Sequence, residues 1–302
     1  MPTMKNKWKK TELKQGDTIM TNPRSDDIII PIMGPTGVGK STFINTAAGK
    51  DVTKVGHNLE SCTAAIVHAI VPHPNYPSRR VVFVDTPGFD DTYEDDTEIL
   101  RRIAVWLAHS YSDNVKLSGI IYLHEITQAR MVGTSRKNFE MFEKLCGIES
   151  AQNVILATTK WGNIKSDAGE RRASQLETFW KDMLSAGSQM ERFNGSQKSA
   201  WDIVKTITDK KLLEALQIQN ELVNLGKLLP QTEAGNALRT SLKNLVAEHK
   251  KTIMELRSEK GDGQQVDDRL KETESQIKSL LGQIQELKIP LSKRILAWFG
   301  LG

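Results

Sequence analysis

The sequence has few cysteines, no long apolar run and no strong excess of one charge. Its two cysteines, Cys62 and Cys146, lie far apart, so they form neither a disulfide framework nor a zinc-site spacing, which favours a reducing compartment. No run approaches the ~20 apolar residues of a membrane-spanning helix. The first residues lack the apolar stretch typical of a secretory signal. We therefore expect a cytoplasmic protein, with a peripheral membrane location as the alternative.

The charges nearly balance, because 41 lysines and arginines face 37 aspartates and glutamates. A formal net charge of +4 does not require a nucleic-acid partner, and we expect none. Lysines are concentrated near the start of residues 1–26. We predict a flexible, basic N-terminal tail there, and the alternative is an arm that binds a membrane or an acidic partner.

From residue 27 onward, short apolar runs alternate with amphipathic stretches. The predicted strands cover residues 28–33, 64–73, 79–85, 117–126 and 153–159. The second and third of these form an antiparallel hairpin. The predicted helices cover residues 41–49, 97–110, 134–147, 168–187 and 198–207. This alternation predicts an α/β fold with a doubly wound, mostly parallel sheet over residues 27–208.

Residues 209–302 show no strand pattern and predict an all-α C-terminal extension. Its helical stretches cover residues 212–229, 234–260 and 267–288. Apolar residues from Leu270 to Ile284 recur every seven positions, so this stretch either packs on its own domain or forms an intermolecular coiled coil. The tail 289–302 is apolar with two cations, so either it lies on a membrane surface or it docks on the preceding domain.

The most specific pattern is Gly-Pro-Thr-Gly-Val-Gly-Lys-Ser at residues 34–41. It matches the phosphate-binding loop G-x-x-x-x-G-K-S/T and lies between a predicted strand and a predicted helix. The glycines let backbone N–H groups turn toward an anion, and Lys40 supplies a positive charge, which we expect to be exposed in the empty loop. The Ser41 hydroxyl is a Mg²⁺ ligand. The predicted phosphate-binding residues are Gly34, Thr36, Gly37, Val38, Gly39, Lys40, Ser41 and Thr42.

A second motif, Val-Val-Phe-Val-Asp-Thr-Pro-Gly at residues 81–88, places Asp85 at the end of a strand. In P-loop nucleoside triphosphatases this carboxylate holds the Mg²⁺ shell. Gly88 can bring its backbone N–H to a γ-phosphate because no side chain intervenes. Together the two motifs predict a P-loop nucleoside triphosphatase with Ser41 and Asp85 at the metal.

These motifs, Ser61-Cys62-Thr63 and the segment from Tyr122 to Gly147 resemble the GTPases related to translation factors. The likeness is greatest to their septin-like branch (septins, chloroplast import receptors and immunity-associated, or GIMAP, GTPases), and to G-domain proteins of the kind that fungi carry. It implies a P-loop G domain that binds GTP or GDP with Mg²⁺, and Thr63 as a Mg²⁺ ligand that senses the γ-phosphate. It also implies a homodimer or oligomer that pairs across the nucleotide face.

One departure from the family pattern concerns the catalytic water. Ras-like GTPases carry a glutamine directly after the glycine of D-x-x-G, whereas this chain has Phe89. An apolar side chain cannot orient water, so hydrolysis is slow or depends on another group or a second chain. The candidate catalytic residues are Lys40, Thr63, His124, Arg130 and Arg136. Asp90 and Asp91 lie nearby in the sequence.

Another departure concerns the base. The guanine-reading motif is N/T-K-x-D, and Thr159 and Lys160 match it, but Gly162 replaces the aspartate. Trp161 is a candidate for stacking on the base, and Asn194 resembles a base-contacting asparagine of GIMAP relatives. The leading hypothesis is a GTPase that is slow and depends on oligomerisation. The alternatives are a triphosphatase that also accepts ATP, and a nucleotide-gated, membrane-associated scaffold with little turnover.

Overall fold

The computed structural model describes residues 14–20, 22–53, 65–91, 94–128, 133–208, 210, 212–258 and 264–288. Two candidate site residues, Thr63 and Arg130, lie outside these ranges, as do residues 1–13 and the apolar tail 289–302. None of the helices in the described ranges is long and apolar enough to cross a membrane.

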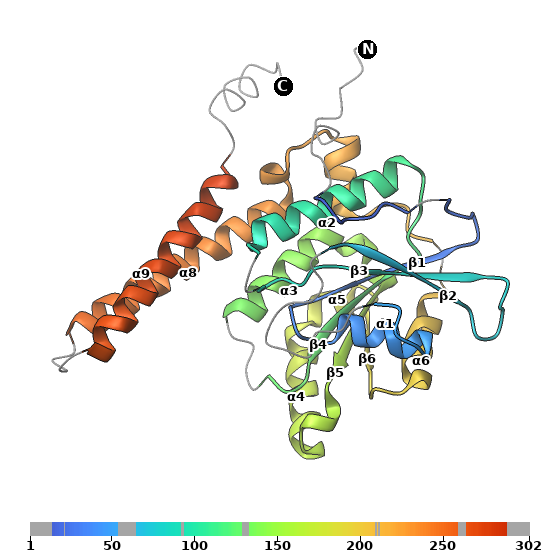
Figure 1. Ribbon diagram of the computed structural model, residues 1–302, viewed down its shortest axis with the longest axis horizontal. Helices are drawn as coiled ribbons and strands as arrows, with labels where there is room; N and C mark the ends of the chain where they lie inside the picture. Colours follow the sequence, from blue (N-terminus) through green and yellow to red (C-terminus); the bar gives the residue numbers. More distant parts are fainter. Residues whose placement is uncertain are drawn as a thin grey trace, which may run out of the picture.

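A six-stranded sheet forms the centre of the molecule (Figure 1). Its order is β2-β3-β1-β4-β5-β6, and all neighbours are parallel except β2 and β3, which form the predicted antiparallel hairpin. The strands are β1 (Ile28–Met33), β2 (Val67–Pro72), β3 (Arg80–Asp85), β4 (Ile120–Glu125), β5 (Val154–Thr159) and β6 (Gln189–Arg192). The sequence patterns did not indicate β6, a short edge strand with only partly buried residues.

The helices cover both faces and one end of this sheet. They are α1 (Lys40–Ala48), α2 (Asp96–Ser112), α3 (Gly133–Cys146), α4 (Ser166–Phe179), α5 (Lys181–Ser185), α6 (Gln197–Thr208), α7 (Gln217–Gln219), α8 (Glu233–Ser258) and α9 (Gln264–Glu286). The single long helix predicted for 168–187 is wrong, because the chain turns at Trp180, whose fully buried ring anchors the break. The helix predicted for 212–229 is also wrong. There the Leu213 N–H donates to Leu117 O (3.0 Å), and only short helical turns form.

The apolar strands explain why the sheet is buried on both faces. Every residue of β1 and of β5 is buried, as expected for central parallel strands. On one face α1 and α6 pack over Ile30, Phe83 and Ile155, and on the other face α2, α3 and α7 close a larger core around Tyr122 and Phe142. The predicted architecture is therefore confirmed: an α/β, mostly parallel sheet followed by an all-α extension.

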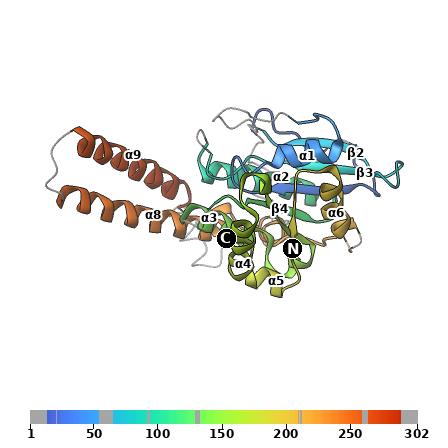
Figure 2. The ribbon, with the colours of Figure 1, turned by 90° about the horizontal axis from the view of Figure 1, so that it is seen from below.

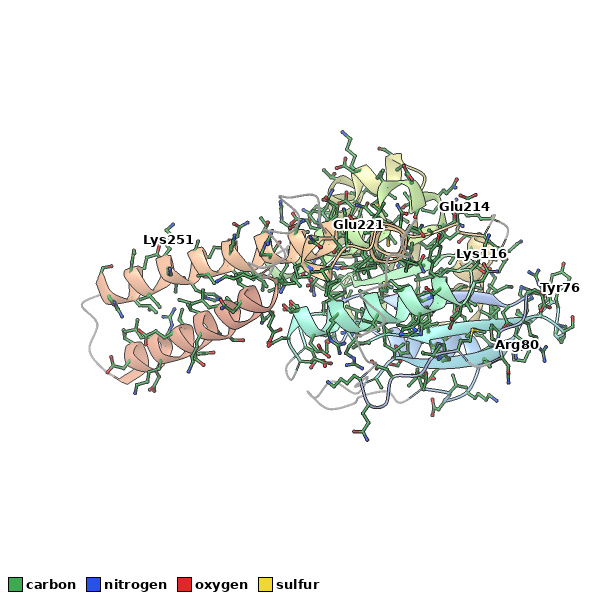
Figure 3. All side chains as sticks on the ribbon, turned by 90° about the horizontal axis from the view of Figure 1, so that it is seen from above. Tyr76, Arg80, Lys116, Glu214, Glu221 and Lys251 are labelled. Carbon is green, nitrogen blue, oxygen red and sulfur yellow. The ribbon has the colours of Figure 1, made fainter. Side chains whose placement is uncertain are left out.

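Helices α8 and α9 form an antiparallel hairpin that projects from the sheet domain (Figures 1 and 2). In Figure 3, Lys251 on this hairpin and Tyr76 beyond β2 lie at opposite ends of the molecule. The apolar stripe of α9 faces its own chain, where Ile284 is buried and Ile277 is half-buried against the same core. Within the described residues, the stripe therefore packs on its own domain, as one of the two alternatives expected.

The described part of the N-terminal segment is not the solvated tail expected for residues 1–26. Residues 14–18, which we name the N-terminal strap, lie against the start of β2 and against α2. The Thr18 N–H donates to Ile66 O (2.9 Å), and the Asp17 carboxylate forms a buried ion pair with Arg102 of α2. A tertiary ion pair at this position could not be read from the local lysine content.

Candidate functional site

The loop between β1 and α1 needs its glycines. Gly34, Gly37 and Gly39 have positive φ angles of 136°, 80° and 100°, where L-amino acids with a side chain are strained. A Cβ at Gly34 would also collide with the backbone carbonyl of Leu123 in β4. The loop therefore folds tightly over the end of the sheet, in front of the N-terminus of α1, which is the arrangement that binds phosphate groups in other proteins.

The side chain of Lys40 lies inside this loop. Its ammonium group donates to the backbone oxygens of Gly34 (3.1 Å) and Pro35 (2.9 Å), and the residue is only 6% exposed. The expected exposure of Lys40 in the empty loop is therefore wrong, because the loop carbonyls satisfy its charge. Burial lowers the pKa of Lys40 to about 8, while the negative charges of Asp85 and Asp91 act in the opposite direction.

The two predicted metal ligands meet beside Lys40. The Ser41 hydroxyl donates to the Asp85 carboxylate over 2.7 Å, and Asp85 stands at the end of β3, paired with Ile32 of β1. A hydroxyl and a carboxylate oxygen are the ligand types that Mg²⁺ prefers. The donor set of this site therefore fits a Mg²⁺ ion.

The segment after β3 lies directly on the loop. A Cβ at Gly88 would lie 2.5 Å from the Thr36 backbone nitrogen and 2.6 Å from the Lys40 ammonium nitrogen, so only glycine fits there. The Thr36 N–H donates to Phe89 O (2.8 Å), and the Thr36 hydroxyl donates to Gly88 O (3.2 Å). Residues 88 and 89 thus contact Thr36 of the loop, and Gly88 lies close to the Lys40 ammonium group.

The end of β5 fixes the other side of the loop. The Thr159 hydroxyl donates to Val38 O over 2.7 Å, and Lys160, with a left-handed φ of 60°, forms an ion pair with Glu125 of β4. Burial acts to raise the pKa of Glu125, but the contact with Lys160 keeps this pKa below its ordinary value. Glu125 belongs to no motif of its own, and only the pairing of β4 with β5 places it opposite Thr159.

The expected stacking of a base on Trp161 does not fit the structure. The indole is 8% exposed, its N–H donates to the Thr158 hydroxyl (3.0 Å), and the Arg192 guanidinium covers the ring at 3.5 Å from its centre. Trp161 therefore belongs to the core. Asn194 is exposed in the turn after β6, where its side-chain oxygen accepts from the Ser196 N–H (3.0 Å). Gly162 is open, since nothing lies within 4 Å of a Cβ built there.

The candidate catalytic residues are not all at the loop. His124 is 2% exposed, and burial lowers its pKa to about 4, so the catalytic role expected for His124 does not fit. The exposed Arg136 places its guanidinium over the Phe179 ring, 5.5 Å from the ring centre. Thr42 is exposed on α1. Thr63 and Arg130 lie outside the described residues, so their roles stay predictions.

Comparison with known proteins identifies the fold. Residues 29–160, less than half of the chain, match the family model described as 50S ribosome-binding GTPase. The match contains the loop, Asp85, Gly88 and the end of β5. The chain contains a P-loop G domain. The matched residues begin in β1 and include Lys40, Ser41 and Asp85.

The relatives share only short segments with this chain. The chain is 32% identical over 110 residues to guanylate-binding protein 5 of Mus musculus, covering 33% of this chain and 18% of that protein. It is 39% identical over 59 residues to GTPase Era of Agrobacterium fabrum, covering 20% of this chain and 17% of the relative. It therefore spans less than a fifth of the length of these relatives. A solved structure, Toc33 from Arabidopsis thaliana with Mg²⁺ and GMPPNP, is similar at 15% identity and a TM-score of 0.49, over 62% of this chain and 87% of that one.

Proposed function

We propose that this protein binds GTP together with Mg²⁺ and hydrolyses it at the γ-phosphate. One observation supports this most: the Ser41 hydroxyl meets the Asp85 carboxylate beside a glycine loop that already holds the Lys40 ammonium group. The two candidate metal ligands, the Lys40 charge and the glycine loop thus lie together beyond the end of β1. GDP would bind in the same loop as the product.

Ser41 and Asp85 would hold the Mg²⁺ ion, with Thr63 as a further ligand. When bound, the ion neutralises charge on the phosphate oxygens. Lys40 would exchange the carbonyls of Gly34 and Pro35 for the β- and γ-phosphates. The Gly88 N–H would donate to the γ-phosphate, because the residue lies against Lys40 without a side chain.

A second candidate function is a triphosphatase that also accepts ATP. It is favoured by Gly162, which leaves open space where a guanine-reading carboxylate would stand. Lys160 forms an ion pair with Glu125. The base would contact the aliphatic part of the Lys160 side chain and the turn that contains Asn194. GTP is preferred in this proposal because the relatives that match are named as GTPases or guanylate-binding proteins.

The division of the chain and its assembly also belong to this proposal. Residues 27–208 would form the G domain and 209–302 its helical extension. Pairing of two chains across the nucleotide face would complete the catalytic site, as in the septin-like branch. The tail 289–302 would place the protein on a membrane surface. If hydrolysis is negligible, the protein would act as a nucleotide-gated scaffold on that surface.

The test is a titration of the purified chain with fluorescent GTP and ATP analogues, with and without Mg²⁺, followed by measurement of phosphate release. We expect Mg²⁺-dependent binding, tighter for GTP, and slow release of phosphate. Lys40→Ala should abolish binding, whereas Lys50→Ala, which changes an exposed lysine just beyond α1, should not. Unchanged affinity in Lys40→Ala would contradict the proposed site. Binding without phosphate release would favour the scaffold.

A further inference from the structure

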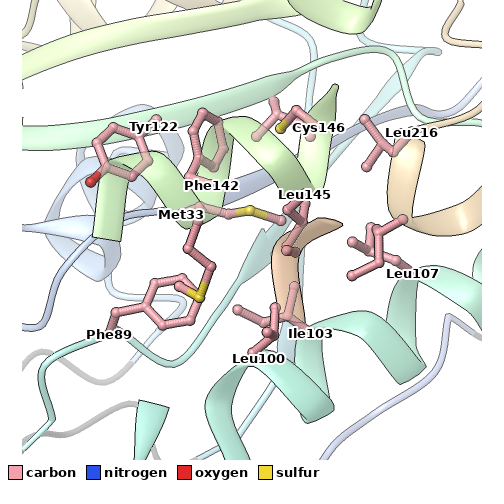
Figure 4. Packing of buried hydrophobic residues seen from close by; sticks show 14 of the residues in the cluster. Met33, Phe89, Leu100, Ile103, Leu107, Tyr122, Phe142, Leu145, Cys146 and Leu216 are labelled. Atoms are coloured by element: carbon pink, nitrogen blue, oxygen red, sulfur yellow. The ribbon is translucent and has the colours of Figure 1, made fainter. Parts of the chain in front are cut away.

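The residue that follows Gly88 cannot orient a water molecule. Phe89 is 1% exposed, and its ring packs in the core with Met33 and Leu100 (Figure 4). Only its backbone reaches the phosphate-binding loop, through the bond from the Thr36 N–H to Phe89 O. The polar side chains nearest to Phe89 along the described chain are those of Asp90 and Asp91.

Asp90 turns away from the loop. It has a left-handed φ of 64°, its N–H donates to the Asp96 carboxylate (2.8 Å), and its own carboxylate lies 3.9 Å from the Lys137 ammonium nitrogen. Lys137 of α3 is buried and also forms an ion pair with Asp96. Asp90 therefore belongs to the contact between the segment after β3 and helices α2 and α3.

Asp91 turns toward the loop. Its carboxylate accepts a hydrogen bond from the Thr36 hydroxyl over 3.2 Å, and this hydroxyl shares its single proton between Asp91 and Gly88 O. Thr36 is the third residue of the loop that starts at Gly34. Gly88, three residues before Asp91, lies against Thr36 and Lys40, so the chain from Gly88 to Asp91 runs along the loop.

We propose that Asp91 is the water-positioning residue of this GTPase, and that Thr36 holds its carboxylate in place. The inference rests on the proposed hydrolysis of GTP. The carboxylate accepts a hydrogen bond from the attacking water. The water oxygen forms a bond to the γ-phosphorus, the bond from phosphorus to the β–γ bridging oxygen breaks, and its electron pair leaves with GDP. One proton of the water passes through Asp91 to an oxygen of the inorganic phosphate, and the other stays on the oxygen that attacked.

A carboxylate beside a triphosphate repels it, because both are negatively charged. A structural role and a water-positioning role of Asp91 therefore predict different effects of its removal on GTP binding and on turnover. A carboxylate that only holds residues 88–91 on the loop would repel the γ-phosphate, so its removal would tighten GTP binding and leave turnover unchanged. A carboxylate that positions water contributes to the rate of the chemical step. General acid–base groups contribute roughly 10²–10⁴-fold to such steps.

The experiment compares Asp91→Asn, Thr36→Val, Thr36→Ser and wild type in single-turnover hydrolysis of GTP and in binding of a fluorescent, non-hydrolysable GTP analogue. Asp90→Asn is the matched control, because it removes a neighbouring carboxylate that faces Lys137. We expect Asp91→Asn to lower the single-turnover rate by ~10²-fold or more without loss of affinity. Thr36→Val should lower the single-turnover rate less than Asp91→Asn does. Thr36→Ser, which keeps the hydroxyl, and Asp90→Asn should both have the wild-type rate.

An unchanged rate in Asp91→Asn, with or without tighter binding, would overturn the inference while leaving the proposed GTPase intact. Equal losses of rate in Asp91→Asn and Asp90→Asn would also overturn it, because both would then act through the shape of the segment. If Asp91→Asn does not fold, the contrast between Thr36→Val and Thr36→Ser decides. No hydrolysis in wild type would contradict the proposed function itself.

Discussion

At the scale of single residues, His124 shows how burial sets a charge state. Its ring lies in β4 with its centre 5.9 Å from that of Trp180 and is 2% exposed. Burial lowers its pKa to about 4, although Glu125 acts in the opposite direction. The folded protein therefore keeps His124 neutral in a pH range where the unfolded chain, with the ordinary value of 6.5, binds a proton.

This difference predicts a loss of stability on acidification. Because the unfolded state binds more protons between pH 6.5 and pH 4, the free energy of unfolding falls as the pH falls through this window. The contribution of His124 reaches about 3 kcal/mol, from about 1.4 kcal/mol per pKa unit. Urea denaturation of His124→Gln at pH 7, 5.5 and 4.5 should show a smaller fall than wild type. Parallel curves would mean that His124 is accessible to protons in the folded state.

A second prediction concerns the base. Gly162→Asp restores the carboxylate of the guanine-reading motif at a position where a Cβ meets nothing within 4 Å. A charge-assisted hydrogen bond contributes about 1.5–3 kcal/mol. We therefore expect the ratio of GTP to ATP affinity to rise by about 10-fold or more, and Gly162→Ala to leave this ratio unchanged. Competition titrations with both nucleotides measure it. A wild-type preference of ~10³-fold or more would show that other groups already read the base.

At the scale of elements, the N-terminal strap joins segments that are distant in sequence. The Arg102 guanidinium on α2 is buried and forms ion pairs with Asp17 of the strap and with Glu94, just before α2. The Asp17 carboxylate also accepts from the Ile66 N–H (2.7 Å) at the start of β2. The strap thus links the chain just before β2 to helix α2.

Removing one charged partner of this buried network should lower the free energy of unfolding. Asp17→Ala leaves the Arg102 charge buried with one carboxylate fewer, and breaking a buried ion pair costs about 3–5 kcal/mol. Asp26→Ala, an exposed carboxylate nearby, should change stability by less than about 0.5 kcal/mol. Chemical denaturation of both variants measures the difference. A loss below about 1 kcal/mol in Asp17→Ala would indicate a solvated pair of the kind found at surfaces.

Elements with a local sequence pattern can be predicted from the sequence, whereas elements and contacts that depend on neighbouring strands cannot. The strands with apolar runs were found because their burial on both faces leaves a local pattern, and the loop at Gly34 was found because phosphate binding needs adjacent glycines and a lysine. β6 was missed because its stability comes from pairing with β5 and not from its own polar residues. The Lys160–Glu125 and Thr36–Asp91 contacts were missed because they depend on which strands are neighbours.

At the scale of the whole molecule, the helical hairpin contacts the segment that follows the second motif. The Gln283 amide of α9 donates to the Asp95 carboxylate (3.0 Å), directly before α2. Helix α8 packs on α3, which also holds Lys137 against Asp96. Contiguous contacts therefore join residues 88–91 to α2, α3 and the hairpin.

Assembly is the last prediction. In the proposed pairing of two chains, an arginine of the second chain would neutralise charge on the γ-phosphate. Such an arginine contributes ~10³–10⁵-fold in rate in GTPases that use one. Arg136 is exposed at the start of α3, and Arg130 precedes it in the sequence. We expect GTP turnover per molecule to rise with protein concentration. Arg130→Ala and Arg136→Ala should lower turnover without weakening GTP binding, whereas Arg171→Ala, an exposed arginine on α4, should not. Turnover that is independent of concentration and unchanged in both variants would place the charge-neutralising groups within one chain.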